Sequence, residues 1–220
     1  MKTALGILLV SAFAVGSSLS VPAKKEKSQV EGGFVALFDG KTLKSWEGKK
    51  KFFRVEEGAI VAGFLDARIP NNEFLASEKE YADFELRFEA KLVGQGKNAG
   101  VQFRSQRIPS KHEMIGYQCD IGSWSKGTIW GFLYDESRRR KMLAEAPQEE
   151  LKKHLRPKGE WNKLVVRAEG PRIQIWLNGY QTVDFTEADE NIPLEGRFGL
   201  QIHSGSPAEA WYRNIRLKKL

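Results

Sequence analysis

Alternating apolar and polar residues recur in short segments along this chain. Residues 83–92 alternate regularly, with Phe84, Leu86 and Phe88 on one face and charged side chains on the other. Because successive side chains of a β-strand point to opposite faces, this pattern predicts an antiparallel strand with one face in the core and one in water. Further strands are predicted at 34–38, 52–55, 59–61, 161–168, 172–177, 197–203 and 211–217, and one short helix at 148–155.

Turn residues separate these segments. Glu56-Glu57-Gly58 and Glu169-Gly170-Pro171 predict two hairpins, and Asn178-Gly179 suits a two-residue type I′ turn. Short strands with turns roughly every 8–12 residues indicate an all-β sandwich or barrel. The chain length and the polar face described below favour a two-sheet antiparallel β-sandwich, a jelly roll with a polar concave face, over a closed barrel.

The first residues are typical of a secretory signal peptide. Lys2 precedes an apolar run at 4–15, and small residues follow up to Ser20 and Ala23. The apolar run is too short to span a bilayer, so we expect cleavage after Ser20 or Ala23 and an exported protein, periplasmic or secreted. A retained membrane anchor is the alternative. We therefore assign 1–23 to the signal peptide, 24–32 to a flexible leader and 33–220 to a single domain without stable membrane insertion.

Charge and cysteine content narrow the classes of partner. The 220-residue chain has a formal net charge of +7, but its basic residues are interleaved with acidic ones and no nucleic-acid motif accompanies them. We therefore expect no nucleic-acid partner, and no oligomeric state is predicted. Cys119 is the only cysteine, so an intrachain disulfide is excluded and the fold must be stable through its core.

Three predicted strands carry reactive or hydrogen-bonding groups on the face opposite their apolar residues. They contribute Gln102 and Arg104, Gln118 and Asp120, and Gln201 and His203. If the strands are neighbours, these side chains form one polar surface. A solvent-facing sheet usually shows Lys, Glu and Thr instead, so we interpret this surface as a site for a polyhydroxylated ligand.

Each candidate also has a structural interpretation. Asp120 is a candidate general base or ligand for a divalent cation, or it caps the turn at Gly122. His203 is a candidate acid or base because imidazole titrates near neutral pH, or it is a structural residue at a strand end. Arg104 is a candidate partner for an oxyanion, or an ordinary surface arginine.

Residues 130–136 form a further strand-like segment rich in candidate contacts. Trp130 and Tyr134 can stack on a sugar ring, and Glu136 can accept hydroxyl protons or act as a base. Alternatively, Trp130 belongs to the core, and Asp135 and Glu136 pair with the arginines that follow them.

Several common chemistries are absent from the sequence. There is no Gly-x-Ser-x-Gly elbow, phosphate loop or Cys-x-x-Cys motif, and the three histidines lack a close metal-binding spacing. The strand of Asp120 carries no second carboxylate, which disfavours ordinary two-carboxylate glycoside hydrolysis.

The order of several motifs resembles that of a known family. Segments 37–46, 98–105, 116–122, 130–138 and 199–205, with Trp161-Asn162 and 177–179, are similar to the 3-keto-disaccharide hydrolase domain family. The resemblance covers roughly residues 32–220. It implies a jelly roll of the concanavalin-like lectin and glucanase type, and an enzyme that acts on glycosides already oxidised at C3 of the sugar.

That activity implies a reaction without a nucleophile. A 3-ketone acidifies the hydrogen on C2, so a base can remove this proton and the C1 substituent can leave by β-elimination, with or without rehydration. The hypothesis assigns Asp120 or His203 as base, Arg104 with Gln118 as enolate stabilisers, and Glu136 or Tyr134 as acid. A divalent cation held by Asp120 and His203 is an alternative polariser.

The expected substrate contacts lie on the same predicted strands and in the segment after them. They are Asn98, Gln102, Gln118, Trp130, Tyr134, Arg138 and Gln201. Two other classes remain open from the sequence: a non-catalytic, lectin-like carbohydrate-binding module and a structural envelope domain, because a fold by itself does not fix a function.

Overall fold

The computed structural model describes Met1 and residues 32–220. Apart from Met1, the predicted signal peptide lies outside the described residues, and so does nearly all of the predicted leader. The strands of the described residues form two antiparallel sheets that pack face to face.

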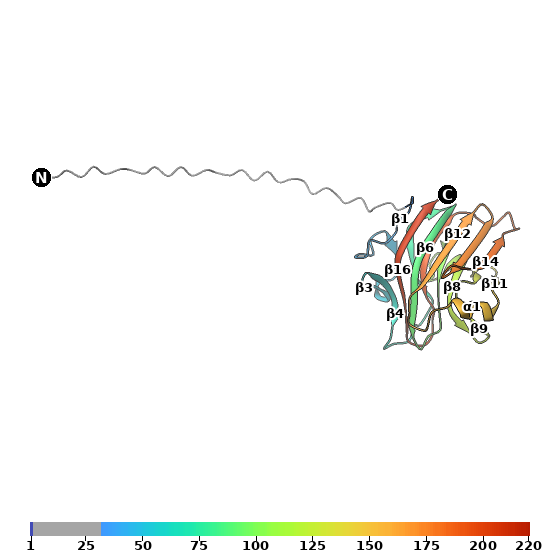
Figure 1. Cartoon of the computed structure of the whole chain (residues 1–220), viewed down its shortest axis with the longest axis horizontal. Helices are drawn as coiled ribbons and strands as arrows, with labels where there is room; N and C mark the ends of the chain where they lie inside the picture. Colours follow the sequence, from blue (N-terminus) through green and yellow to red (C-terminus); the bar gives the residue numbers. More distant parts are fainter. Residues whose placement is uncertain (2–31) are drawn as a thin grey trace.

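The first sheet has the strand order β14-β13-β12-β6-β16-β4-β3, and β1 pairs with β16. Figure 1 shows the long strands β12, β6 and β16 side by side. The bounds are β1 (Val35–Ala36), β3 (Phe53–Glu56), β4 (Ala59–Phe64), β6 (Phe84–Gly94), β12 (Asn162–Glu169), β13 (Arg172–Leu177), β14 (Tyr180–Thr186) and β16 (Ala208–Lys219).

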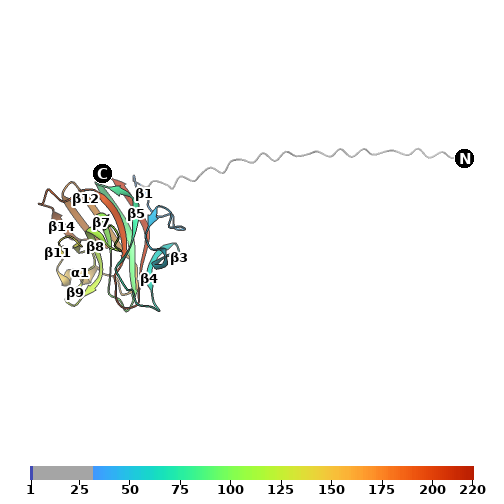
Figure 2. The ribbon, with the colours of Figure 1, turned by 180° about the vertical axis from the view of Figure 1, so that it is seen from behind.

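The second sheet has the order β11-β10-β8-β7-β15-β5-β2, and β9 pairs with β8. Its bounds are β2 (Trp46–Glu47), β5 (Glu73–Tyr81), β7 (Asn98–Arg107), β8 (Met114–Trp124), β9 (Gly127–Thr128), β10 (Leu133–Glu136), β11 (Lys141–Ala144) and β15 (Gly196–Ile202). A 3₁₀ turn, η1 (Lys50–Phe52), precedes β3, and the helix α1 (Gln148–His154) lies beside β9 (Figure 2).

The core lies between the two sheets and follows the period of two that the sequence predicts. On β6, the alternate residues Phe84, Leu86 and Phe88 are buried, whereas their neighbours are more exposed. Phe84 packs edge-to-face against Phe103 and Phe198 of the second sheet, with ring centroids 6.1 and 4.8 Å away. The predicted jelly roll of two stacked sheets is therefore confirmed, together with the hairpins and the short helix.

One predicted strand begins later than expected. Residues 130–132 form a turn, in which Phe132 N donates to Ile129 O at 3.0 Å, and β10 begins only at Leu133. Gly131 has φ +75°, and a Cβ at this position would lie 2.9 Å from Thr182 Oγ1. Trp130 and Tyr134 therefore do not alternate along one strand, which changes the position expected for Trp130.

Replacing Phe84 tests the contact between the sheets. Phe84→Ala removes a fully buried ring that touches two aromatic rings of the opposite sheet, so we expect it to lower the free energy of unfolding by about 3–5 kcal/mol. Urea unfolding measures the loss. Phe84→Leu keeps most of the buried volume and should cost less; equal losses for the two variants would contradict this role of the ring.

Candidate active site

A polar cluster lies on the outer face of the second sheet. Its residues alternate with the core residues of β7, β8, β10 and β15, which are neighbours in the order β10-β8-β7-β15. On β8, Tyr117, Cys119 and Ile121 join the core, so Gln118 and Asp120 point to the other face. We define the polar cluster as Asn98, Gln102, Gln118, Asp120, Tyr134, Glu136, Gln201 and His203.

A glycine on the central strand allows the side chains of the cluster to meet. Gly100 of β7 pairs with Asp120 on one side and with Gln201 on the other. A Cβ on Gly100 would lie 2.6 Å from Cδ of Gln118. The side chain of Gln118 therefore lies over β7 at Gly100, and any larger residue at position 100 would displace it.

Two amide side chains connect the two carboxyl groups of the cluster. Gln118 Nε2 donates to Asp120 Oδ1 at 2.8 Å and to Gln201 Oε1 at 3.2 Å. Gln201 Nε2 in turn donates to Glu136 Oε2 at 3.4 Å. The predicted grouping of Gln118, Asp120 and Gln201 is present, and the chain of hydrogen bonds extends it to Glu136 on the neighbouring strand.

Burial shifts the pKa of both carboxyl groups in the same direction. Asp120 is 1% exposed, and burial raises its pKa to about 8. The negative charge of Glu136 raises this pKa further, whereas the hydrogen bond from Gln118 lowers it. Burial and the charge of Glu113 also raise the pKa of Glu136, whereas His203 lowers it. At neutral pH Asp120 therefore holds a proton.

Several buried atoms of the cluster have no hydrogen-bond partner among the described residues. They are Asn98 Oδ1, Gln102 Oε1 and Nε2, Gln118 Oε1 and Asp120 Oδ2. Since buried polar groups are normally paired, this concentration in one place is typical of a ligand-binding site. Oδ1 of Asp120 accepts from Gln118, so the carboxyl proton belongs on Oδ2, where it can be donated to a ligand.

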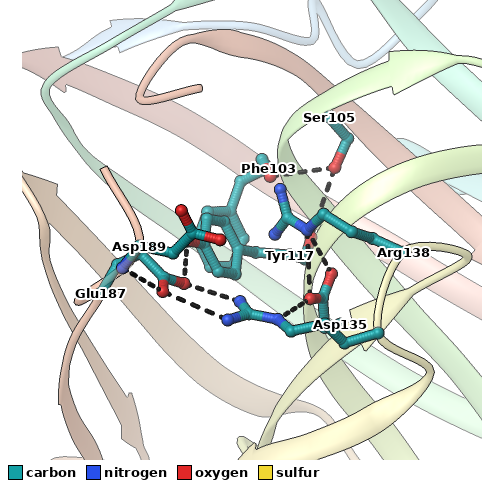
Figure 3. A network of polar contacts seen from close by, with 8 residues as sticks. Phe103, Ser105, Tyr117, Asp135, Arg138, Glu187 and Asp189 are labelled. Carbon is teal, nitrogen blue, oxygen red and sulfur yellow. Dashed lines mark hydrogen bonds and ion pairs between the residues drawn. The ribbon is translucent and has the colours of Figure 1, made fainter. Parts of the chain in front are cut away.

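An ionic network lies on the core side of the same sheet. Asp135, next to Glu136, is fully buried and accepts from Arg138 Nε at 3.0 Å and from Arg139. Arg139 also pairs with Glu187 at 2.6 Å, and Tyr117 donates its hydroxyl proton to Glu187 at 2.6 Å. Figure 3 shows Asp135, Arg138, Tyr117 and Glu187 converging. This network anchors β10 and the turn after it, which directs Glu136 toward the polar cluster.

Arg138 is therefore placed differently from the prediction. Its guanidinium lies over the Tyr117 ring, 4.6 Å from the centroid, on the face of the sheet opposite Gln118. The expected contact of Arg138 with substrate is wrong in this geometry, because Asp135 draws the side chain toward the core. The alternative that Asp135 pairs with the following arginines is confirmed, whereas Glu136 bonds to Gln201 instead.

Arg104 also lies away from the cluster. The register of β7 against β8 shifts between Phe103 and Gln106, and Arg104 has φ +46°. Its buried guanidinium pairs with Asp83 at 2.9 Å and donates to the carbonyl oxygens of Ala82 and Gly170. The prediction that Arg104 shares a face with Gln118 and Asp120 is wrong, because the irregularity breaks the period of two just before it.

Trp130 belongs to a different part of the surface. It is 7% exposed, packs in the core and lines a cavity of about 320 Å³ together with Leu92, Leu155 and Asn162. The expected stacking of Trp130 on the ligand of the polar cluster is therefore wrong. The alternative that Trp130 is a core residue is confirmed.

The candidate metal ligands do not gather into a metal site. In the part of the chain that the structure describes, no three or more His, Cys, Asp or Glu side chains converge in a way that could hold an ion. The imidazole Nδ1 of His203 instead lies 2.8 Å from Ser204 O. Among the same residues, no helix is long and apolar enough to cross a membrane.

The sequence named Glu136 as a candidate acid, and the structure adds that it forms a pair of carboxyl groups with Asp120 from the neighbouring strand β10. Trp124 was not predicted from the sequence. Trp124 continues the even-numbered face of β8 beyond Asp120, and its ring lies 5.7 Å from that of Tyr134. Following the alternation of side chains along β8 for four residues beyond Asp120 would have identified Trp124.

A jelly roll with a buried carboxyl–amide cluster on the outer face of one sheet defines the class of this protein: a galectin-like or concanavalin-like β-sandwich. The chain belongs to the family described as the 3-keto-alpha-glucoside-1,2-lyase-like domain, whose model matches residues 33–218. The family resemblance found in the sequence is thereby confirmed.

Known proteins similar to this chain share the family or the fold. A 3-keto-disaccharide hydrolase of Bacteroides thetaiotaomicron is 25% identical, with 86% of this chain and 79% of that protein covered. A solved structure described as a candidate glycosyl hydrolase from Parabacteroides distasonis has a TM-score of 0.63 at 20% identity, covering 86% of this chain and 94% of that one. A carbohydrate-binding module from Bacillus subtilis has a TM-score of 0.60 at 17% identity, covering 80% and 96%.

The raised pKa of Asp120 makes a prediction about stability. The folded protein binds this proton more tightly than the unfolded chain, so the stabilising contribution is complete below the ordinary pKa of 3.8 and is lost as the pH rises toward about 8. Asp120→Asn removes this dependence. We expect its thermal midpoint to exceed that of the original protein at pH 8, by roughly 3 °C or more, and the difference to shrink near pH 4.

Differential scanning calorimetry at both pH values measures the two differences. Glu190→Gln, at an exposed position, serves as the control and should show no such trend. A difference between Asp120→Asn and the original protein that does not change with pH would contradict the buried, protonated state of Asp120.

Proposed function

We propose that this protein cleaves 3-keto-glycosides by removing the C2 proton and eliminating the C1 substituent. The observation that carries the proposal is a pair of carboxyl groups in one cluster but in different surroundings: Asp120 is buried and Glu136 is half-buried. Such a pair supplies one acid and one base at the same pH. The family description and the name of the Bacteroides relative support the choice of substrate.

Glu136 is the base in this proposal. Burial also raises the pKa of Glu136, but this side chain is only half-buried, and His203 and the hydrogen bond from Gln201 favour its ionised form. Asp120 is buried deeper and holds its proton up to about pH 8. The Glu136 carboxylate takes the hydrogen from C2, and the electron pair of the C–H bond moves toward the 3-keto oxygen to form an enolate. This assignment reverses the order favoured by the sequence, which placed Asp120 or His203 as base and Glu136 or Tyr134 as acid.

Gln102 is the candidate donor for the enolate oxygen. Its amide nitrogen is buried and has no partner among the described residues, so it can donate to a developing negative charge without breaking another hydrogen bond. The sequence assigned this task to Arg104 with Gln118, but Arg104 lies elsewhere. Gln118 and Gln201 hold the two carboxyl groups in place through their own hydrogen bonds.

Asp120 is the acid that completes the elimination. As the enolate collapses, a C1=C2 double bond forms, the C1–O bond breaks, and Asp120 Oδ2 gives its proton to the leaving oxygen. Water can then add to C1, with Asp120 taking its proton and Glu136 returning a proton to C2. Both carboxyl groups regain their starting states, and the net reaction is hydrolysis.

Comparing an oxidised substrate with its parent tests the reaction. We expect the purified protein to cleave a 3-keto-glucoside and to leave the unoxidised glucoside intact, because only the ketone acidifies C2. In D₂O, the Glu136 carboxyl exchanges the proton it has taken with solvent, so the released 3-keto sugar should gain one deuterium at C2, which mass spectrometry detects. A parallel reaction with a chelator reports any dependence on a divalent cation. Cleavage of both compounds would indicate direct two-carboxylate hydrolysis, and binding without cleavage would indicate the lectin-like alternative.

Leaving groups of different acidity separate the roles of the two carboxyl groups. Asp120→Asn should lower kcat/KM for a 3-keto-disaccharide by roughly 10²–10⁴-fold, but much less for 4-nitrophenyl 3-keto-glucoside, whose leaving group needs no proton. Glu136→Gln should lower kcat/KM for both substrates alike, since C2 deprotonation is common to them. Glu190→Gln is the matched control. If the two variants showed the opposite patterns, the roles would have to be exchanged.

A further inference from the structure

Trp124 presents its indole to solvent beside the polar cluster. It is 42% exposed and is the one exposed tryptophan among the described residues, since Trp46, Trp130 and Trp211 are buried and the other two are partly covered. A large aromatic side chain left open next to unpartnered buried polar atoms is typical of a binding site.

The strand places Trp124 on the face of the cluster. Gln118, Asp120 and Trp124 are separated by even numbers of residues along β8, so their side chains point the same way. The Trp124 ring meets the Tyr134 ring edge-to-face, at 5.7 Å between centroids and an interplanar angle of 88°. Because Tyr134 can cover at most one face of the indole, the other face is free of it.

The contact with Tyr134 requires the end of β8 to curl back. Tyr134 is paired with Gln118, which is six residues before Trp124, or roughly 20 Å along a straight strand. Gly122 lies between them with φ +121°, and a Cβ there would come within 2.0 Å of Lys97 O. The β8–β9 hairpin therefore bends at Gly122 and brings Trp124 back toward the cluster.

We propose that Trp124 and Tyr134 form an aromatic platform that binds the leaving-group ring of the substrate. The ligand chemistry is a ring with a flat apolar face, supplied either by a second pyranose or by an aromatic aglycone. This inference rests on the proposed function, because it takes the position of the leaving group from the role of Asp120.

The position of the platform beside Asp120 determines which ring lies on it. Tyr134 is paired with Gln118, two residues before Asp120, and the Trp124 ring lies against the Tyr134 ring. The keto sugar must lie over Glu136 and Gln102 for its C2 proton to be removed. The group on the other side of the broken bond, which receives the proton of Asp120, then lies toward Trp124.

Equilibrium binding tests the platform without relying on turnover. The Glu136→Gln background blocks C2 deprotonation for every substrate, so all three ligands can be compared at equilibrium. In this background, isothermal titration calorimetry compares Trp124→Ala with the tryptophan form for methyl 3-keto-glucoside, 4-nitrophenyl 3-keto-glucoside and a 3-keto-disaccharide. We expect Trp124→Ala to weaken the ligands that carry a ring by roughly tenfold and to leave the methyl compound within about twofold. Trp124→Phe should retain most of the affinity.

Comparing the three ligands shows which kind of ring occupies the platform and which results would contradict it. A loss confined to the disaccharide identifies a pyranose as the occupant, and a loss confined to the nitrophenyl compound identifies an aromatic aglycone. Lys126→Ala, at the exposed tip of the same hairpin, should change none of the affinities. Equal losses for all three ligands, no loss for either ring-bearing ligand, or no binding at all would overturn the platform.

Failure of the proposed reaction would look different. If no 3-keto-glycoside were cleaved but Trp124→Ala still weakened the ring-bearing ligands selectively, the platform would stand as part of a carbohydrate-binding site. If cleavage occurred with the expected dependence on Asp120 while all Trp124 variants bound the three ligands equally well, the proposed reaction would be supported and the platform would be contradicted.

Discussion

The packing of apolar side chains between the two sheets fixes the direction of every polar side chain in the site. Tyr117, Cys119 and Ile121 are fully buried in the core, so Gln118 and Asp120 must point to the other face of β8. A shift of one residue in register would exchange the two sets and bury a carboxyl group among aromatic rings. The stability of the core and the composition of the site are therefore set by the same alignment of strands.

Two buried carboxyl groups show how the protein uses the two faces of one sheet differently. On the core side, burial alone would raise the pKa of Glu187, but hydrogen bonds from Arg139 and Tyr117 lower it to about 2. On the outer side, Asp120 has no ion-pair partner among the described residues. It accepts a hydrogen bond from the Gln118 amide and faces the negative charge of Glu136, and burial raises its pKa to about 8. Glu187, which is paired with a cation, therefore stays an anion in its ionic network, whereas Asp120, which is not, can act as a proton donor.

Neighbouring residues on β10 divide these tasks. Asp135 points inward to Arg138 and Arg139, and Glu136 points outward to Gln201. The inward network stabilises the strand and its turn, whereas the outward cluster carries buried polar atoms without partners, which costs stability. Such a cost is common at functional sites, because the groups that must bind or react with a ligand cannot also be fully paired within the protein.

The sequence by itself determined the antiparallel sandwich, most strand positions, and the common face of Gln118, Asp120 and Gln201, because these follow from local alternation and turn residues. It could not place Arg104 or Trp130, since an irregularity in β7 and a turn at Gly131 interrupt the alternation just where each residue stands. Nor could it bring Glu136 to Asp120 or Trp124 to Tyr134. Those contacts depend on which strands become neighbours and on how β8 bends at Gly122, and only the packing of the two sheets decides this.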